Sequence, residues 1–272
     1  MKKLLLLFFL FIHAGSSYAQ SSSDSLAAKE GSAAADDPSQ FLTRVELFNE
    51  LQHHQYDGAD FYFNQTTLRT IVKIGKRFTT RVDVPFVYNS TSVADYKQFG
   101  LSDISFRLLG YKIAQSKKSA FTASIEISLN TASSPLLGTG KNIIIPVISY
   151  TTMLKPNRIL FATIFQEALS FSGDENREDI SYSKVQPILL NIWSRKLWTV
   201  LAPELYIDYV HGGASMNLEG RIAYAPIKRI NVWAQVGLGL FGDFIARYEW
   251  GAEVGCRYFF LRNTIFKRKT SG

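Results

Sequence analysis

The chain has 272 residues but a single cysteine, Cys256, and only four histidines. One cysteine cannot form an intramolecular disulfide, so such crosslinks do not hold this fold together. The adjacent pair His53 and His54 lacks a convincing third ligand nearby, which argues against a zinc-type site. The sequence also contains no glycine-rich phosphate loop and no dinucleotide motif. We therefore expect no metal site and no cofactor.

Long apolar runs are almost as rare as cysteine. One covers residues 4–12, follows two lysines and precedes small residues, which is the pattern of a secretory signal peptide over residues 1–19. The run is about half as long as the roughly twenty residues of a spanning helix, so an N-terminal anchor is the weaker interpretation. Because no comparable run follows, any membrane crossing by the mature chain has to use strands.

Charge of one sign is not concentrated enough to indicate a nucleic-acid surface. The formal net charge is +7, and part of the basic excess lies in the signal peptide and in residues 261–272. We expect a solvated basic C-terminal tail there, and no nucleic-acid partner. Residues 20–40 are rich in Ser, Ala and Asp and hold one large apolar residue, Leu26. That composition predicts a flexible periplasmic leader.

From Phe41 to Phe260 the sequence alternates between apolar and polar residues in runs of roughly 10 to 16 residues. The last run has an apolar face that comprises Ala246, Tyr248, Trp250, Ala252, Val254, Cys256, Tyr258 and Phe260. The same division recurs in residues 121–130 and 230–240, so one face suits lipid and the other suits water. Ile125→Arg would place a charge on the lipid face, so it should destabilise the barrel by roughly 2–4 kcal/mol and impair its assembly. Glu126→Gln, on the water face, should be tolerated.

About twelve such runs predict an all-β fold, a transmembrane antiparallel up-and-down β-barrel over residues 41–260. The predicted strands are 41–51, 63–74, 77–88, 101–114, 119–130, 142–154, 158–171, 180–193, 197–210, 214–226, 229–241 and 245–260. Tight turns alternate with longer connections at 52–62, 89–100, 131–141 and 172–179, as in barrels with short periplasmic turns and long extracellular loops. An even strand number predicts that both termini are periplasmic, in the outer membrane of a Gram-negative bacterium.

A water-soluble β-sandwich or barrel is the alternative fold, because strands with one apolar face also pack there. The runs are about twice the five or six residues of a typical soluble strand, which favours tilted spanning strands. Tyr and Trp near the ends of the runs suggest interfacial girdles. These aromatic residues are Tyr88, Tyr111, Tyr150, Trp193, Trp198, Tyr209 and Trp250. The runs 158–171 and 185–193 are apolar on both faces, so their orientation stays open.

Three stretches carry a family likeness: GLSDISFRLLGYKI at 100–113, SLNTASSPLLGTGK at 128–141 and GDENREDISYSKVQPIL at 173–189. They resemble the bacterial outer-membrane barrels of the phenol meta-cleavage-pathway family, which are often described as transporter-like. Asp103 and the Gly138-Thr139-Gly140-Lys141 turn are among the most specific points of this likeness. The resemblance implies transport of small, often hydrophobic or aromatic, compounds.

The polar face of the runs supplies candidate pore-lining residues of both charge signs. They are Arg44, Glu46, Arg69, Arg81, Asp83, Asp103, Arg107, Glu126, Glu204, Asp208, Glu219, Arg221, Arg247, Glu249, Glu253 and Arg257. One interpretation is a charge-lined pore whose field selects solutes. The other is an ion-paired interior that mainly fills the barrel, because an unpaired buried charge is costly. The sequence leaves both open.

A channel or transporter for an unknown small solute is the expected function, with outer-membrane lipids and lipopolysaccharide as its surroundings. Gly255, Tyr258 and Phe260 resemble the signal read by the barrel-assembly machinery, which is therefore an expected partner. A structural or adhesive barrel without a conducting pore is one alternative. A lipid hydrolase is another and would need a base such as His211 beside a nucleophile such as Ser215. No phospholipase-like motif accompanies them, so we expect no catalytic residues and no enzyme.

Overall fold

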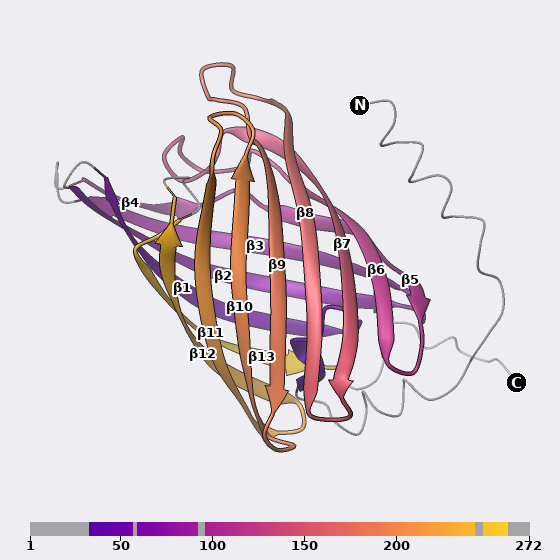
Figure 1. The fold of residues 1–272 in the computed structure, drawn as a ribbon. Coiled ribbons are helices and arrows are strands. Elements are labelled where there is room, and N and C mark those ends of the chain that lie inside the picture. Colours follow the sequence, from indigo (N-terminus) through magenta and orange to yellow (C-terminus); the bar gives the residue numbers. More distant parts are fainter. Residues whose placement is uncertain (1–32, 57–58, 92–95, 243–246, 261–272) are drawn as a thin grey trace, which may run out of the picture.

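The computed structural model describes residues 33–56, 59–91, 96–242 and 247–260 (Figure 1). The predicted signal peptide, residues 20–32 of the predicted leader and the predicted tail lie outside the described residues. The described chain forms one short 3-10 helix and thirteen strands. They are η1 (Ala33–Ala35), β1 (Arg44–Tyr56), β2 (Ala59–Ile74), β3 (Phe78–Thr91), β4 (Tyr96–Leu101), β5 (Ser105–Gln115), β6 (Ser119–Ser128), β7 (Lys141–Lys155), β8 (Ile159–Gly173), β9 (Ser181–Ile192), β10 (Leu197–Asp208), β11 (Ala214–Ile227), β12 (Ile230–Phe241) and β13 (Trp250–Phe259).

The strands form one antiparallel sheet that closes on itself. β1 pairs with β2 on one side and with β13 on the other, from Arg44 opposite Phe259 to His53 opposite Trp250. β3 pairs with β5 over its first half and with β4 over its second half. The closed wall therefore has twelve strands, and β4 is an additional strand that extends the β3 hairpin. The predicted twelve-stranded antiparallel barrel is confirmed.

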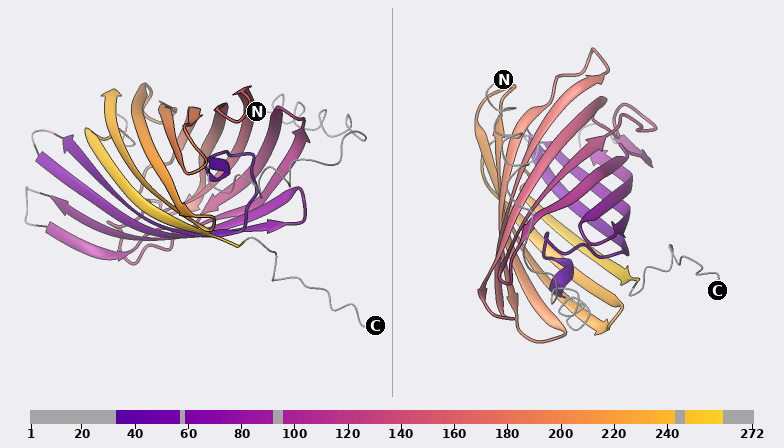
Figure 2. Two further views of the ribbon diagram at one scale, coloured as in Figure 1. Left: turned by 90° about the horizontal axis from the view of Figure 1, so that it is seen from below. Right: turned by 90° about the vertical axis from the view of Figure 1, so that its right-hand side faces the viewer.

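The two ends of the barrel differ, and we name them by their connections. The turn end carries the tight connections β2–β3, β5–β6, β7–β8, β9–β10 and β11–β12, together with the start of β1 and the finish of β13. The loop end carries the other connections except residues 102–104, which link β4 to β5 partway along β3. Figure 2 shows the indigo and purple hairpins of β1 to β4 reaching further than their neighbours on one side of the barrel.

Two of the four predicted long loops are confirmed and two are wrong. The connections β6–β7 and β8–β9 span 129–140 and 174–180, close to the predicted positions. The described part of the predicted loop 52–62 is instead paired strand, with His53 opposite Tyr62. The predicted loop 89–100 holds the end of β3 and all of β4 but its last residue, Leu101. Both segments contain aromatic residues, among them Phe61, Tyr62 and Phe99, which favour extended pairing across the hairpin.

The outer surface of the barrel is apolar. Leu47, Leu68, Leu201, Ile222 and Val236 come from five different strands, and each is between 45% and 66% exposed. A continuous exposed apolar surface of this kind is what a lipid-facing wall requires. The alternation predicted for 121–130 and 230–240 is confirmed, because Glu126 and Asn231 are buried inside the wall. Within the described residues, no helix is long and apolar enough to cross a membrane.

Two aromatic residues do not face the way the sequence suggested. Trp198 was expected in an interfacial girdle but is fully buried inside the barrel, because the register of β10 turns its even-numbered residues inward. Tyr248 was expected on the lipid face with Trp250 but is buried and contacts Glu219 in the lumen. Regular pairing of β13 with β12 begins only at Trp250, so the alternation does not extend back to Tyr248.

Candidate functional site in the barrel lumen

A chain of ion pairs runs along the inner wall from β6 through β5, β3, β2, β1 and β13 to β11. Glu126 on β6 accepts hydrogen bonds from Arg81 on β3 and Arg107 on β5, each at 2.6 Å. Arg69 on β2 then contacts Asp83 at 2.8 Å. We call this chain the ionic belt; its members are Glu126, Arg107, Arg81, Asp83, Arg69, Glu46, Arg44, Arg257, Asp36, Arg221 and Glu253. Opposite charges alternate along it, so few of these side chains face the lumen as isolated charges.

The N-terminal segment completes the belt. Asp36 lies just after η1, and its Oδ1 is 3.1 Å from the guanidinium groups of both Arg221 and Arg257. Its Oδ2 accepts a hydrogen bond from the indole N–H of Trp198 at 2.6 Å. The side chain of Asp36 is only 6% exposed. A segment that lies before the first strand is therefore built into the barrel interior.

The residues after Asp36 continue along the inside of the turn end. Asp37 accepts hydrogen bonds from the backbone N–H and the hydroxyl of Ser39 at 2.8 and 2.7 Å, which forms a compact turn. Phe41 is buried, and the ammonium of Lys112 on β5 lies 5.4 Å from its ring centroid. In Figure 2, the indigo helix η1 lies within the outline of the barrel. Residues 33–41, which we call the N-terminal plug, thus occupy part of the turn-end mouth.

A cavity of about 710 Å³ lies in the lumen, and it extends toward the loop end. Glu204 accepts hydrogen bonds from Lys184 and from the hydroxyl of Tyr206, both at 2.8 Å. Glu219 accepts one from the hydroxyl of Tyr248 at 3.0 Å, and Glu50 accepts one from Gln52 at 2.7 Å. The cavity wall thus combines acidic groups, amides and aromatic hydroxyls that are able to hydrogen-bond a passing solute.

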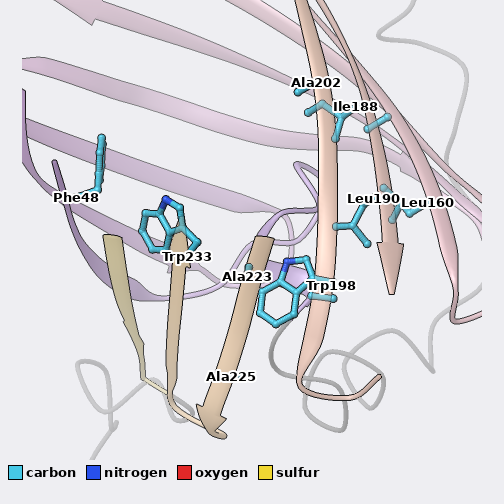
Figure 3. Close-up of a cluster of buried hydrophobic side chains, with 11 residues drawn as sticks. Phe48, Leu160, Ile188, Leu190, Trp198, Ala202, Ala223, Ala225 and Trp233 are labelled. Carbon is cyan, nitrogen blue, oxygen red and sulfur yellow. The ribbon is translucent and has the colours of Figure 1, made fainter. Parts of the chain in front are cut away.

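Toward the turn end, the inner wall of β8 to β11 carries an apolar surface, in contrast to the belt. In Figure 3, Leu160 and Leu190 lie side by side on neighbouring strands, and Ile188 and Ala202 lie further along the same wall. Trp198 and Ala223 continue this surface, and Met153, Ile164, Ile192 and Val200 pack against it. This surface, which we call the apolar strip, accounts for the two runs that read as apolar on both faces. Their outer face meets lipid, and their inner face lines the lumen.

The plug does not fill the turn-end mouth. A second cavity of about 860 Å³ lies between the plug and the turns β5–β6, β7–β8 and β9–β10. Ala33, Asp37 and Gln40 line one side of this cavity, and Met153 and Leu190 line the other. The lumen therefore has one cavity on each side of its ion-paired middle, and both cavities touch polar and apolar groups.

The predicted pore-lining residues fall into three groups. Nine of them line the cavity that extends toward the loop end: Glu46, Arg69, Asp83, Asp103, Glu204, Glu219, Arg221, Glu253 and Arg257. Arg44, Arg81, Arg107 and Glu126 belong to the ionic belt. Asp208, Arg247 and Glu249 lie near the loop end, where Asp208 accepts the backbone N–H of Val210 and Arg247 pairs with Glu249. Six of the nine cavity residues, all but Asp103, Glu204 and Glu219, also belong to the ionic belt. Selection of solutes by these charges stays a prediction.

Several lumen residues are not among the candidates predicted from the sequence. Glu50 follows Arg44 and Glu46 in the same two-residue period, so the pattern itself could have found it. Lys184 likewise lies on the inward face of its strand, opposite Tyr206. Asp36 carries no such signal, because it lies in a segment without periodicity.

The arrangement considered for a hydrolase is not assembled. Nδ1 of His211 lies 2.8 Å from Asp208, and Nε2 lies 2.9 Å from Glu178 in the β8–β9 loop. These two contacts, first with Asp208 and then with Glu178, raise the pKa of His211 above its usual value. Both ring nitrogens thus contact carboxylates, and neither contacts Ser215. In the part of the chain that the structure describes, no three His, Cys, Asp or Glu side chains are placed to hold a metal ion.

The closed wall, its apolar exterior and its cavities can be compared with known proteins. Solved outer-membrane barrels share this fold. An outer-membrane channel from Pseudomonas putida F1 superposes with a TM-score of 0.68 at 12% identity, over 82% of this chain and 99% of that one. The KdgM porin in complex with oligogalacturonate has a TM-score of 0.54 at 11% identity, over 80% of this chain and 99% of that one.

The same fold also occurs in a barrel with another task. The translocator domain of the autotransporter NalP from Neisseria meningitidis has a TM-score of 0.51 at 12% identity, over 87% of this chain and 98% of that one. No family model and no curated protein matches the sequence. The comparisons therefore establish the fold, and function has to be argued from the lumen itself.

Proposed function

We propose that this protein is an outer-membrane channel through which small molecules cross. The observation that carries the proposal is a closed wall with an apolar outside that encloses two lumen cavities. A purely structural barrel of this size could fill its interior with side chains, whereas here the cavities lie on both sides of the ionic belt. The channel and porin folds found by comparison support the proposal.

The two-sided lumen favours solutes that have an apolar part and a polar part. The apolar strip offers a surface for a ring or an alkyl group, and the wall around Glu204 and Tyr206 offers hydrogen-bonding groups. This combination supports membership of the transporter-like family that the sequence resembles, whose solutes are often hydrophobic or aromatic.

The surroundings follow from the same proposal. Lipids and lipopolysaccharide cover the apolar exterior, and the barrel-assembly machinery inserts the chain. The turn end, which holds the short connections, faces the periplasm, and the loop end faces the outside, as is usual for bacterial barrels. The plug would then meet solutes at their exit into the periplasm.

Swelling of lipid vesicles tests the proposal. Vesicles that contain the refolded barrel should swell in isotonic tetramethylammonium chloride and in isotonic phenyltrimethylammonium chloride, whereas protein-free vesicles should not. Ile188→Asn adds a polar group to the apolar strip, so it should slow entry of the phenyl compound more than entry of the other; Ile188→Val is the matched control. Failure of a verified folded barrel to admit either solute would contradict the channel and favour a structural or adhesive barrel.

A further inference from the structure

The loop 129–140, between β6 and β7, folds inward over the loop end of the lumen. Leu136, Leu137 and Thr139 line the same cavity as the acidic residues of the opposite wall. Leu137 is only 3% exposed. A Cβ atom on Gly100, which lies on the inner face of β4, would be 2.8 Å from Leu137 Cδ1, so the glycine provides the space in which this leucine packs. The loop thus forms part of the lumen wall.

One carboxylate fixes both ends of this loop. Asp103 Oδ1 accepts the backbone N–H groups of Thr131 and Ala132, each at 3.2 Å. Its Oδ2 accepts the backbone N–H of Thr139 at 2.7 Å and the hydroxyl of Thr139 at 2.8 Å. A Cβ atom on Gly138 would lie 2.6 Å from Asp103 Oδ1, so only glycine lets the chain approach so closely. Two of the three stretches that carry the family likeness, 100–113 and 128–141, meet at this contact.

The middle of the loop is held independently of Asp103. The backbone N–H of Ser133 donates to the carbonyl of Leu101 on β4 at 2.9 Å. Asn89 on β3 donates to the carbonyl of Leu136 at 2.9 Å, and Arg177 donates to the carbonyl of Pro135. These contacts set the loop against the β3–β4 hairpin, while the Leu136 side chain itself remains 55% exposed at the cavity.

We propose that loop 129–140 is the selectivity-determining constriction at the loop end, and that Asp103 is the residue that positions it. The inference rests on the proposed channel function and deepens it. A solute that enters from the loop end meets Leu136 at the cavity mouth. Because four hydrogen bonds to a single side chain hold both ends of the loop, a change at Asp103 alters the aperture without touching the ionic belt.

Thiol labelling under single-channel recording tests the position of the loop. Leu136→Cys is made in a Cys256→Ala background and exposed to a positively charged, membrane-impermeant methanethiosulfonate. Modification should lower the single-channel current by at least about a third, because a bulky charge then occupies the mouth. Phe99→Cys is the matched control: Phe99 lies on the neighbouring hairpin but is 71% exposed on the outer face, so labelling there should leave the current unchanged.

The role of Asp103 is tested separately. Asp103→Asn keeps the shape of the side chain but replaces one acceptor oxygen with a donor, so the loop should loosen and the open-state current noise should increase. Asp174→Asn is the control, because that carboxylate hydrogen-bonds within its own loop to Asn176. Folding of each variant is checked by circular dichroism.

The outcomes separate the inference from the proposed function. If the parent barrel conducts but neither labelling at position 136 nor Asp103→Asn alters the current, the loop is not the constriction and the channel function stands. If the verified folded parent barrel does not conduct, both the constriction and the channel function are contradicted. A current that changes with Asp103→Asn and with labelling at Leu136→Cys, but not with either control, supports the inference.

Discussion

Glu126 shows how much an inward-facing charge depends on its partners. The sequence placed it on a water-lined face, where Glu126→Gln should be tolerated. The structure instead buries it between Arg81 and Arg107. Removing one partner of a buried ion pair leaves uncompensated charge, which typically costs a few kcal/mol. The neighbouring residue Ile125 faces outward, as expected.

We therefore predict that Glu126→Gln lowers the free energy of unfolding by on the order of 3 kcal/mol. Ile125→Arg should lower the free energy of unfolding by roughly 2–4 kcal/mol, because it places a charge on the lipid face. Urea unfolding of the barrel in lipid vesicles measures both. Ser124→Ala is a control from the same strand. Unfolding of Glu126→Gln at the parent urea concentration would mean that water, rather than the two arginines, compensates this carboxylate.

Asp36 anchors the plug through residues far away in the sequence. Asp36→Asn keeps the side-chain shape but removes the charge that Arg221 and Arg257 share. We predict that the plug is released part of the time, so the mean single-channel conductance increases at least twofold and slow transitions between current levels appear. Ala34→Ser, which changes the plug without touching the belt, should behave like the parent. An unchanged conductance in Asp36→Asn would show that the plug does not limit flow.

At the residue scale, the sequence predicted which side of the wall most charges face but not what each one does. The two-residue period placed Glu204 and Glu219 at the cavity, since alternation follows from strand geometry alone. It could not show which of these charges pair with one another, because pairing depends on which strands and side chains meet in space. Asp36 was out of reach for the same reason, since its partner Arg257 lies 221 positions further along the chain.

At the element scale, two loops at the loop end are joined by one histidine. His211, in the β10–β11 connection, contacts Glu178 in the β8–β9 loop and Asp208 at the end of β10. An imidazole that carries both protons donates to both carboxylates, whereas a neutral one donates to only one. Since the pKa of His211 is raised in the fold, the double contact is complete at pH values below the usual histidine pKa and is lost as pH rises through the raised value.

We predict that residues 174–180 become more mobile as pH rises through this range. Amide hydrogen exchange, corrected for its intrinsic pH dependence, should show growing exchange in this loop for the parent protein. In His211→Gln the loop should exchange fast at every pH. Equal pH profiles in the two proteins would show that this contact does not order the loop.

The strands themselves were largely predictable, and the hairpin ends were not. β7 to β12 lie within about two residues of their predicted bounds, because long alternating runs leave little choice of register. The hairpins β1–β2 and β3–β4 extend through segments that were expected to be loops. Contacts such as the one between the His53 and Tyr62 rings, whose centroids are 5.0 Å apart, stabilise the additional cross-strand pairs. The alternation of apolar and polar residues within a single strand does not reveal such cross-strand contacts.

At the scale of the whole molecule, the cavity that extends toward the loop end has an acidic excess. Seven carboxylates line this cavity, against four cationic side chains. The carboxylates belong to Glu46, Glu50, Asp83, Asp103, Glu204, Glu219 and Glu253, and the cations to Arg69, Lys184, Arg221 and Arg257. Because a pore lined by an excess of one charge enriches ions of the opposite charge, an open channel with this acidic lining should prefer cations.

We predict a cation preference that reversal potentials in a potassium chloride gradient can measure. The double variant Glu204→Gln, Glu219→Gln should reduce the permeability ratio of potassium over chloride by about half or more. Gln186→Glu adds a carboxylate to the same wall and should shift the ratio the opposite way. A parent barrel that prefers anions would contradict the assignment of this cavity to the conduction path.

The most direct test of the proposed channel function is single-channel recording of the mature protein, refolded and verified as a barrel, in a planar lipid bilayer. We predict reproducible current steps that arise from the lumen, increase when Asp36→Asn loosens the plug and favour cations. Silence from a verified folded barrel, in the parent and in Asp36→Asn alike, would contradict this function and would mean that the lumen is closed and the barrel serves a structural or adhesive purpose.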